Sequence, residues 1–174
     1  METLYKLFLT ILLLITLSAC SDKKSNDTES NPFGSTDNNE SNILQPCNWT
    51  FTVEESANDE VILISTAKID SAWHLYSQLI PDKHVRTEFA YESSHNYSLL
   101  GNTDEGESHK EYDPYLEMEV LYFERKAEFK QKIKVLSKTG FTIKGTIDYM
   151  VCNTQCVSLD EEFSFTVKGN PDGV

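Results

Sequence analysis

The stretch FTIKGTIDYMVCNTQC, residues 141–156, alternates apolar and polar side chains along much of its length and then presents two cysteines. A period of two residues is typical of a β-strand with one buried face. Beyond the cysteines, the alternation resumes at Phe163, Phe165 and Val167. The two runs predict paired strands that form a hairpin, or flank a longer loop, with both cysteines near its tip.

The same alternation recurs between residues 46 and 170, and clusters of turn-type residues separate the runs. No segment carries a long helical face. Roughly seven to nine short strands in one domain favour an all-β fold, built as an antiparallel β-sandwich. The other alternating runs are Trp49 to Val53, Val61 to Ile69, Met118 to Tyr122 and Phe129 to Val135.

The N-terminus has the features of a bacterial export signal. Lys6 precedes an apolar run at residues 7–17, which is too short to cross a bilayer comfortably. Small residues then lead to Cys20, as in a lipoprotein signal. We therefore predict a signal peptide at residues 1–19 and acylation of Cys20, which anchors the chain to a lipid bilayer. The alternative is an ordinary secretory signal with a coincidental cysteine.

The mature chain is predicted to begin with a tether. Residues 20–45 are rich in polar and charged side chains and should remain disordered. Residues 46–170 are the predicted folded domain, which the tether holds off the lipid in the cell envelope, either in the periplasm or at the outer surface. The net charge of −13 argues against a nucleic-acid partner.

Cys152 and Cys156 form the feature with the most chemical content. Outside the cytosol, a close pair of thiols can cycle between dithiol and disulfide. Facing residues of a hairpin lie about 4.5–5.5 Å apart at Cα, within disulfide range. A ring of about five residues removes only about 2 kcal/mol of denatured-state entropy, against nearly 5 for about 100 residues. A bond between these two cysteines would therefore add little stability, and the pair is a candidate for reversible oxidation and reduction.

Other interpretations of the cysteines stay open. The bridge could be purely structural, and the C-x-x-x-C spacing differs from the C-x-x-C of thioredoxin-type sites. Nearby acids would disfavour a thiolate if they lie close in space. A zinc site could combine Cys152, Cys156 and Cys47 with a histidine, but no second close pair is present, so we predict no metal and no cofactor. Cys47 is expected to be a free thiol. The nearby acids are Asp148, Asp160, Glu161 and Glu162, and the histidines are His74, His84, His95 and His109.

Three stretches resemble the periplasmic N-terminal domain of the thiol:disulfide interchange protein DsbD. They are SAWHLYSQ at residues 71–78, EYDPY at residues 111–115 and YMVCNTQC at residues 149–156. Their order and spacing together are more specific than the cysteine pair alone. The resemblance implies that the sandwich is immunoglobulin-like.

The resemblance also implies roles for individual residues. Cys152 and Cys156 would form the redox pair, with Cys156 the expected attacker on target disulfides. Asp113 and Tyr115 would match the acid and the aromatic residue of a cap that shields the pair, and Tyr76 a tyrosine that lines the site. The implied partners are a membrane electron conduit and a thioredoxin-like protein, which supply electrons. Oxidised envelope proteins would be the substrates.

Two departures from the family pattern bear on this prediction. Val157 and Ser158 follow the second cysteine, where family members often have two prolines. The 174 residues also contain neither the electron conduit nor the thioredoxin-like domain. The sequence therefore predicts one component of an extracytoplasmic thiol–disulfide relay, which needs separate proteins to supply its electrons. The alternative is a non-enzymatic immunoglobulin-like lipoprotein that binds an envelope protein and carries a structural disulfide.

Overall fold

The computed structural model describes residues 44–56, 59–114 and 116–172, which form strands and turns without a helix. The predicted signal peptide, Cys20, nearly all of the tether and Tyr115 lie outside these residues. Within the described part of the chain, there is accordingly no helix long and apolar enough to cross a membrane.

Sheet A is antiparallel, in the order β1-β2-β9-β5, and β6 also pairs with β9. Its strands are β1 (Cys47–Glu55), β2 (Glu60–Ile69), β5 (Tyr97–Leu99), β6 (Asp104–Glu105) and β9 (Lys126–Val135). Sheet B has the order β11-β10-β3-β8-β7, and β4 also pairs with β10. Its strands are β3 (His74–Tyr76), β4 (Glu88–Tyr91), β7 (His109–Asp113), β8 (Met118–Glu124), β10 (Phe141–Cys152) and β11 (Cys156–Val167).

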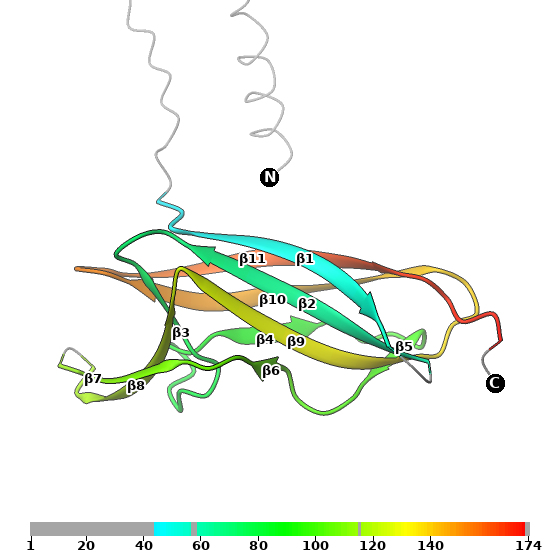
Figure 1. Cartoon of the computed structure of the whole chain (residues 1–174), viewed down its shortest axis with the longest axis horizontal. Helices are drawn as coiled ribbons and strands as arrows, with labels where there is room; N and C mark the ends of the chain where they lie inside the picture. Colours follow the sequence, from blue (N-terminus) through cyan, green and yellow to red (C-terminus); the bar gives the residue numbers. More distant parts are fainter. Residues whose placement is uncertain (1–43, 57–58, 115, 173–174) are drawn as a thin grey trace, which may run out of the picture. The chain divides into compact units, whose positions relative to one another are not determined.

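The two sheets pack face to face, with β1, β2 and β9 in one layer and β4, β10 and β11 in the other (Figure 1). Aromatic rings from both sheets meet in the core between them. Phe51 of β1 lies 5.6 Å from Phe165 of β11, measured between ring centroids. Trp49 likewise lies 5.4 Å from Tyr149 of β10. The predicted all-β antiparallel sandwich is therefore confirmed.

The long strands follow the predicted alternation, whereas the short ones were not predicted. Eleven strands occur in the described residues, instead of the expected seven to nine. The difference comes from elements such as β5 and β6, which have three and two residues. Elements of this length show no periodicity, and their pairing with β9 defines them.

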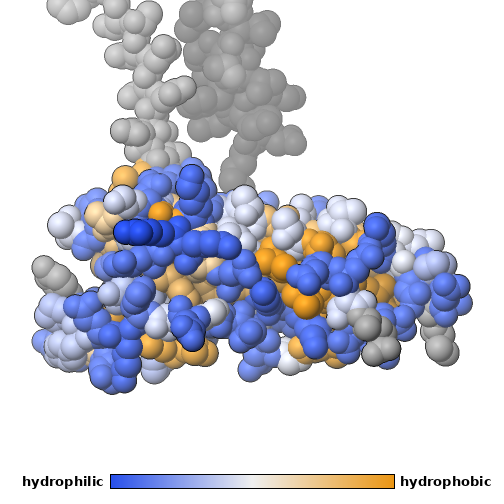
Figure 2. All heavy atoms as spheres, in the orientation of Figure 1, coloured by the Kyte–Doolittle hydropathy of each residue, from blue (hydrophilic) through white to orange (hydrophobic). Residues whose placement is uncertain are grey.

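The sandwich has two distinct ends. The turn between β10 and β11 and the hairpin formed by β7 and β8 lie at the same end, away from the C-terminus (Figure 1). The face of the molecule drawn in Figure 2 is predominantly hydrophilic, in keeping with the acidic composition. The end that carries β7, β8 and the β10–β11 turn therefore holds the cysteine pair.

Candidate functional site

The β10–β11 hairpin places Cys152 directly opposite Cys156. The two residues are register partners, their Cα atoms lie 4.1 Å apart, and their sulfurs form a disulfide. The intervening turn is held locally, because the Gln155 N–H donates to Asn153 Oδ1 at 3.0 Å. The Asn153 N–H in turn donates to the Gln155 carbonyl at 3.0 Å. The hairpin interpretation of residues 141–167 is confirmed, although β11 begins at Cys156 and not near Phe163.

The two cysteines differ strongly in accessibility. Cys152 is only 2% exposed, whereas Cys156 is exposed at the end of the hairpin. Thiol–disulfide exchange requires an incoming thiolate to reach one sulfur of the bond. An incoming thiolate can therefore approach the disulfide through Cys156, with Cys152 as the sheltered sulfur.

The disulfide lies on the outer face of sheet B and not in the core between the sheets. Val151 and Leu75 belong to the core between the sheets, so their neighbours Cys152 and Tyr76 point to the opposite face. Cys152 and Tyr76 there belong to a second apolar cluster. Its other members are the buried Ile80, Val85 and Val120 and the half-buried Leu116, Met118, Tyr122 and Met150. Residues of the β7–β8 hairpin therefore pack in the same cluster as Cys152.

A hydrogen bond between Tyr76 and Asp113 connects this cluster to the β7–β8 hairpin. The buried Tyr76 hydroxyl donates to Asp113 Oδ2 at 2.8 Å. The Leu116 N–H donates to Asp113 Oδ1 at 3.1 Å, inside the turn of the hairpin. Burial, together with the adjacent Asp113, raises the pKa of Tyr76 well above its usual range, so the phenol stays protonated as a donor. The structure thus brings Cys152, Tyr76 and Asp113 together, while Tyr115 lies outside the described residues.

His74 lies beside the cysteine pair, although the sequence indicated it only as one of four possible zinc ligands. It is the register partner of Cys152 on one side and of Glu124 on the other. Its ring lies 5.2 Å from that of Tyr76 and 5.0 Å from that of Tyr122, between centroids. The signal was present in the motif His74-Leu75-Tyr76, because residues two apart in a strand share a face.

The carboxylates that lie near the cysteine pair in space are not the acids that lie near it in the sequence. Asp148 and Asp160 are register partners four residues along the hairpin from the cysteines, about 13 Å at strand rise. Glu161 lies on the opposite face of the sheet, where its charge helps to raise the pKa of Cys47. The acids whose charges tend to raise the pKa of His74 are instead Asp113, Glu124 and Glu111, from β7 and β8.

Cys47 is separate from the cysteine pair of the hairpin. It is free, fully buried and part of the core between the sheets, as the first residue of β1. Burial raises its pKa to about 12, with smaller contributions from Glu161 and Asp70, so the thiol is protonated at neutral pH. Among the described residues, no group of three or more His, Cys, Asp or Glu side chains is placed to hold a metal ion.

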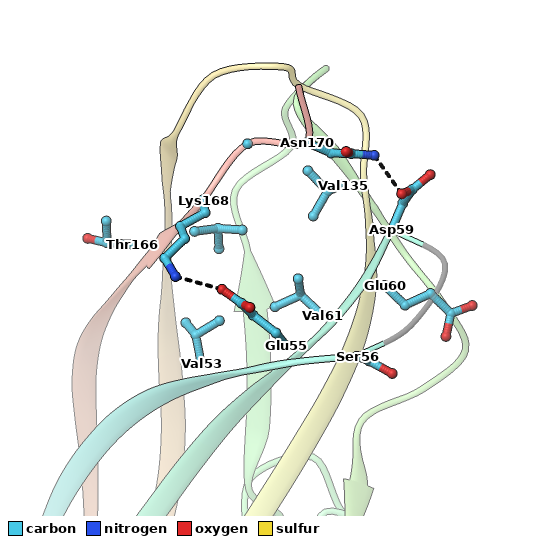
Figure 3. Close-up of a pocket in the computed structure, with 12 residues that line it drawn as sticks. Val53, Glu55, Ser56, Asp59, Glu60, Val61, Val135, Thr166, Lys168 and Asn170 are labelled. Atoms are coloured by element: carbon cyan, nitrogen blue, oxygen red, sulfur yellow. Dashed lines mark hydrogen bonds and ion pairs between the residues drawn. The ribbon is translucent and has the colours of Figure 1, made fainter. Parts of the chain in front are cut away.

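A pocket of about 440 Å³, lined by both polar side chains and valines, occupies the other end of the sandwich (Figure 3). Lys168 Nζ pairs with Glu55 Oε1 at 2.8 Å across it, and both side chains are exposed. Lys168 directly follows β11, whose first residue is Cys156, so this pocket lies about 36 Å along the strand from the disulfide. It is not part of the cysteine site.

Comparisons with known structures find proteins of similar fold. The N-terminal periplasmic domain of ScsB from Proteus mirabilis superposes with a TM-score of 0.55 at 13% identity, over 74% of this chain and 50% of that one. This chain thus spans half of that relative's length. The reduced N-terminal domain of DsbD from Neisseria meningitidis gives a TM-score of 0.47 at 14% identity, over 68% of this chain and 86% of that one.

Sequence comparison with protein families gives the more decisive result. No curated protein sequence matches the chain. Residues 40–168, however, match the family described as "Thiol:disulfide interchange protein DsbD, N-terminal". This match includes every described strand and both cysteines of the hairpin. The chain therefore belongs to the family of DsbD N-terminal domains.

Proposed function

We propose that this chain is an extracytoplasmic thiol–disulfide exchange domain that passes reducing equivalents to oxidised envelope proteins through Cys152 and Cys156. One observation carries the proposal: the two cysteines form a disulfide at the tip of a hairpin, with one cysteine exposed and the other buried. Family membership supports the same function.

The reaction is a pair of sulfur displacements. In the reduced domain, the Cys156 thiolate attacks a target disulfide, and the displaced target sulfur leaves as a thiolate. Cys152 then attacks the Cys156 sulfur, which reforms the disulfide of the domain and releases the target as a dithiol. A thioredoxin-like partner, itself supplied by a membrane electron conduit, reduces the domain again by attacking Cys156. Cys156 is the attacker and the entry point because it is the exposed residue of the pair.

The β7–β8 hairpin acts as a cap that limits exchange with stray thiols. Leu116 and Met118 pack in the cluster that buries Cys152, and Asp113 ties the hairpin to Tyr76. Tyr115, two residues after Asp113 in the sequence, is assigned as the cap aromatic residue by the family pattern. A partner that displaces the hairpin gains access to both sulfurs, so the cap is a kinetic gate.

The domain works at a membrane surface in this proposal. The signal at residues 1–19 directs export, and acylated Cys20 anchors the chain to the bilayer. Residues 20–45 form a flexible tether with an average reach of about 25–30 Å. The folded domain of residues 46–170 can then meet both an electron donor in the membrane and soluble targets in the envelope.

Mixed-disulfide capture in cells tests this function. A full chain with Cys152→Ser keeps the attacking thiol but cannot resolve the intermediate. It should accumulate disulfide-linked complexes with envelope proteins that carry a reactive cysteine pair, seen on non-reducing gels and identified by mass spectrometry. The matched Cys156→Ser chain should capture none. Equal capture by both variants, or capture by neither, would favour the alternative of a binding lipoprotein with a structural disulfide.

A further inference from the structure

A row of side chains crosses the outer face of sheet B at the redox pair. Strand register places Cys156, Cys152, His74 and Glu124 side by side on β11, β10, β3 and β8. Side chains of directly opposed residues have Cβ atoms about 4.5–5.5 Å apart. The His74 imidazole is therefore within reach of the Cys152 sulfur without movement of the backbone.

The resolving step needs a proton acceptor at this position. Cys152 must lose its proton before its sulfur attacks, since the thiolate is the nucleophile. At 2% exposure, Cys152 has little direct access to water that could take the proton. Among the described residues, His74 is the histidine in register with a cysteine of the pair, whereas His109 is in register with Tyr122.

The surroundings of His74 suit a base that is neutral at rest. Its ring is half-buried and packs against Tyr76 of its own strand and Tyr122 of β8. Burial lowers the pKa of His74, and this effect outweighs the upward pull of its three neighbouring carboxylates. These are Asp113 and Glu111 of β7 and Glu124 of β8. The imidazole is thus unprotonated at neutral pH, yet the imidazolium formed on accepting a proton would face three acids.

We propose that His74 accepts the proton of the Cys152 thiol when the mixed disulfide on Cys156 is resolved. The S–H bond of Cys152 breaks, and its proton moves to the imidazole. The new Cys152–Cys156 bond forms as the bond between Cys156 and the target breaks, and the electron pair leaves on the target sulfur. The domain is oxidised by two electrons and the target is reduced by two. This role refines the proposed exchange function and rests on it.

Ellman's reagent separates the two steps in time. A reduced full chain with Cys20→Ala and Cys47→Ala retains two of its four cysteines, Cys152 and Cys156. Attack by Cys156 releases one thionitrobenzoate, and resolution by Cys152 releases the second. His74→Gln should slow the second release about tenfold at pH 7, the effect of losing about one pKa unit of thiolate stabilisation. The first release should keep its rate.

The pH dependence distinguishes proton transfer from a structural effect. In the parent chain, the second release should be nearly constant between pH 7 and 8 and fall as the pH drops through the lowered pKa of His74. In His74→Gln it should rise about tenfold per pH unit, as expected for an unassisted thiol. His74→Phe, which keeps a ring against Tyr76 and Tyr122, should behave like His74→Gln. The control His109→Gln should match the parent.

Three outcomes would overturn the role of His74. In the first, His74→Gln leaves the rate of the second release and its pH profile as in the parent chain. In the second, His74→Gln slows both releases equally. In the third, His74→Phe restores the parent rate of the second release. In each of these cases, release of two equivalents by the parent chain would leave the exchange function standing. If the parent chain released none, both the exchange function and the role of His74 would be wrong.

Discussion

Replacing Cys156 with serine should abolish exchange, lowering the rate of thionitrobenzoate release from Ellman's reagent by at least about a thousandfold. Cys156 is the exposed cysteine of the pair, and a serine hydroxyl is not a nucleophile toward disulfides at neutral pH. In a chain that also carries Cys20→Ala, the remaining thiols are those of Cys152 and Cys47. Cys152 is 2% exposed within the second apolar cluster, and Cys47 is buried with a pKa of about 12. Neither thiol can take over the attack.

Cys152→Ser is the matched control for this prediction. It removes the other sulfur of the same bond but leaves Cys156 exposed, so it should release one equivalent at close to the parent rate and then stop. Stopped-flow absorbance measures both rates. If Cys152→Ser lost the first release while Cys156→Ser kept it, the assignment of attacking and resolving sulfurs would be reversed.

Gly145→Ala should destabilise the domain by about 3 kcal/mol or more, the upper range for overpacking a well-filled site. Gly145 lies in β10, between Tyr91 of β4 and Phe163 of β11. A Cβ at this position would lie 2.1 Å from the Ala90 carbonyl oxygen and 2.3 Å from the ζ carbon of Phe163. Backbone on one side and a core ring on the other leave the methyl group no space.

Urea unfolding of the chain measures this effect. Gly106→Ala is the matched control, because a Cβ on Gly106 meets no atom within 4 Å and the change should stay within about 0.5 kcal/mol. Since β10 carries Cys152 at its end, a shift of this strand should also disturb the disulfide hairpin. Equal stability of the two alanine variants would contradict the packing described for β4, β10 and β11.

The long strands could be predicted from sequence because a buried face imposes its period on them. Phe141 to Val151 alternate in the sequence, and the same positions face the core. The first half of β11 was missed because Asp160, Glu161 and Glu162 interrupt the apolar pattern. Its backbone nevertheless continues the pairing with β10, down to Cys156.

The site was only partly predictable, because its second apolar cluster depends on tertiary packing. The cysteine pair came from the sequence itself, and Tyr76 and Asp113 came from a family pattern. The structure joins the two cysteines in a disulfide, links Tyr76 to Asp113 by a hydrogen bond and places Cys152 and Tyr76 in one cluster. Ile80 and Val85 carry no periodic signal, yet they help to bury Tyr76 and Cys152. His74 was weighed only as a zinc ligand, because its pairing with Cys152 depends on how β3 aligns with β10.

A redox titration of the Cys152–Cys156 bond tests the central claim most directly. The chain is equilibrated in glutathione or dithiothreitol buffers of defined potential, and the free thiols are trapped by alkylation and counted by mass spectrometry. A reversible exchange pair should show a midpoint between about −270 and −180 mV, the range spanned by thioredoxin, glutaredoxins and protein disulfide isomerase, with both forms folded. A bond that stays oxidised below about −300 mV would be a structural disulfide and would contradict the electron-transfer function.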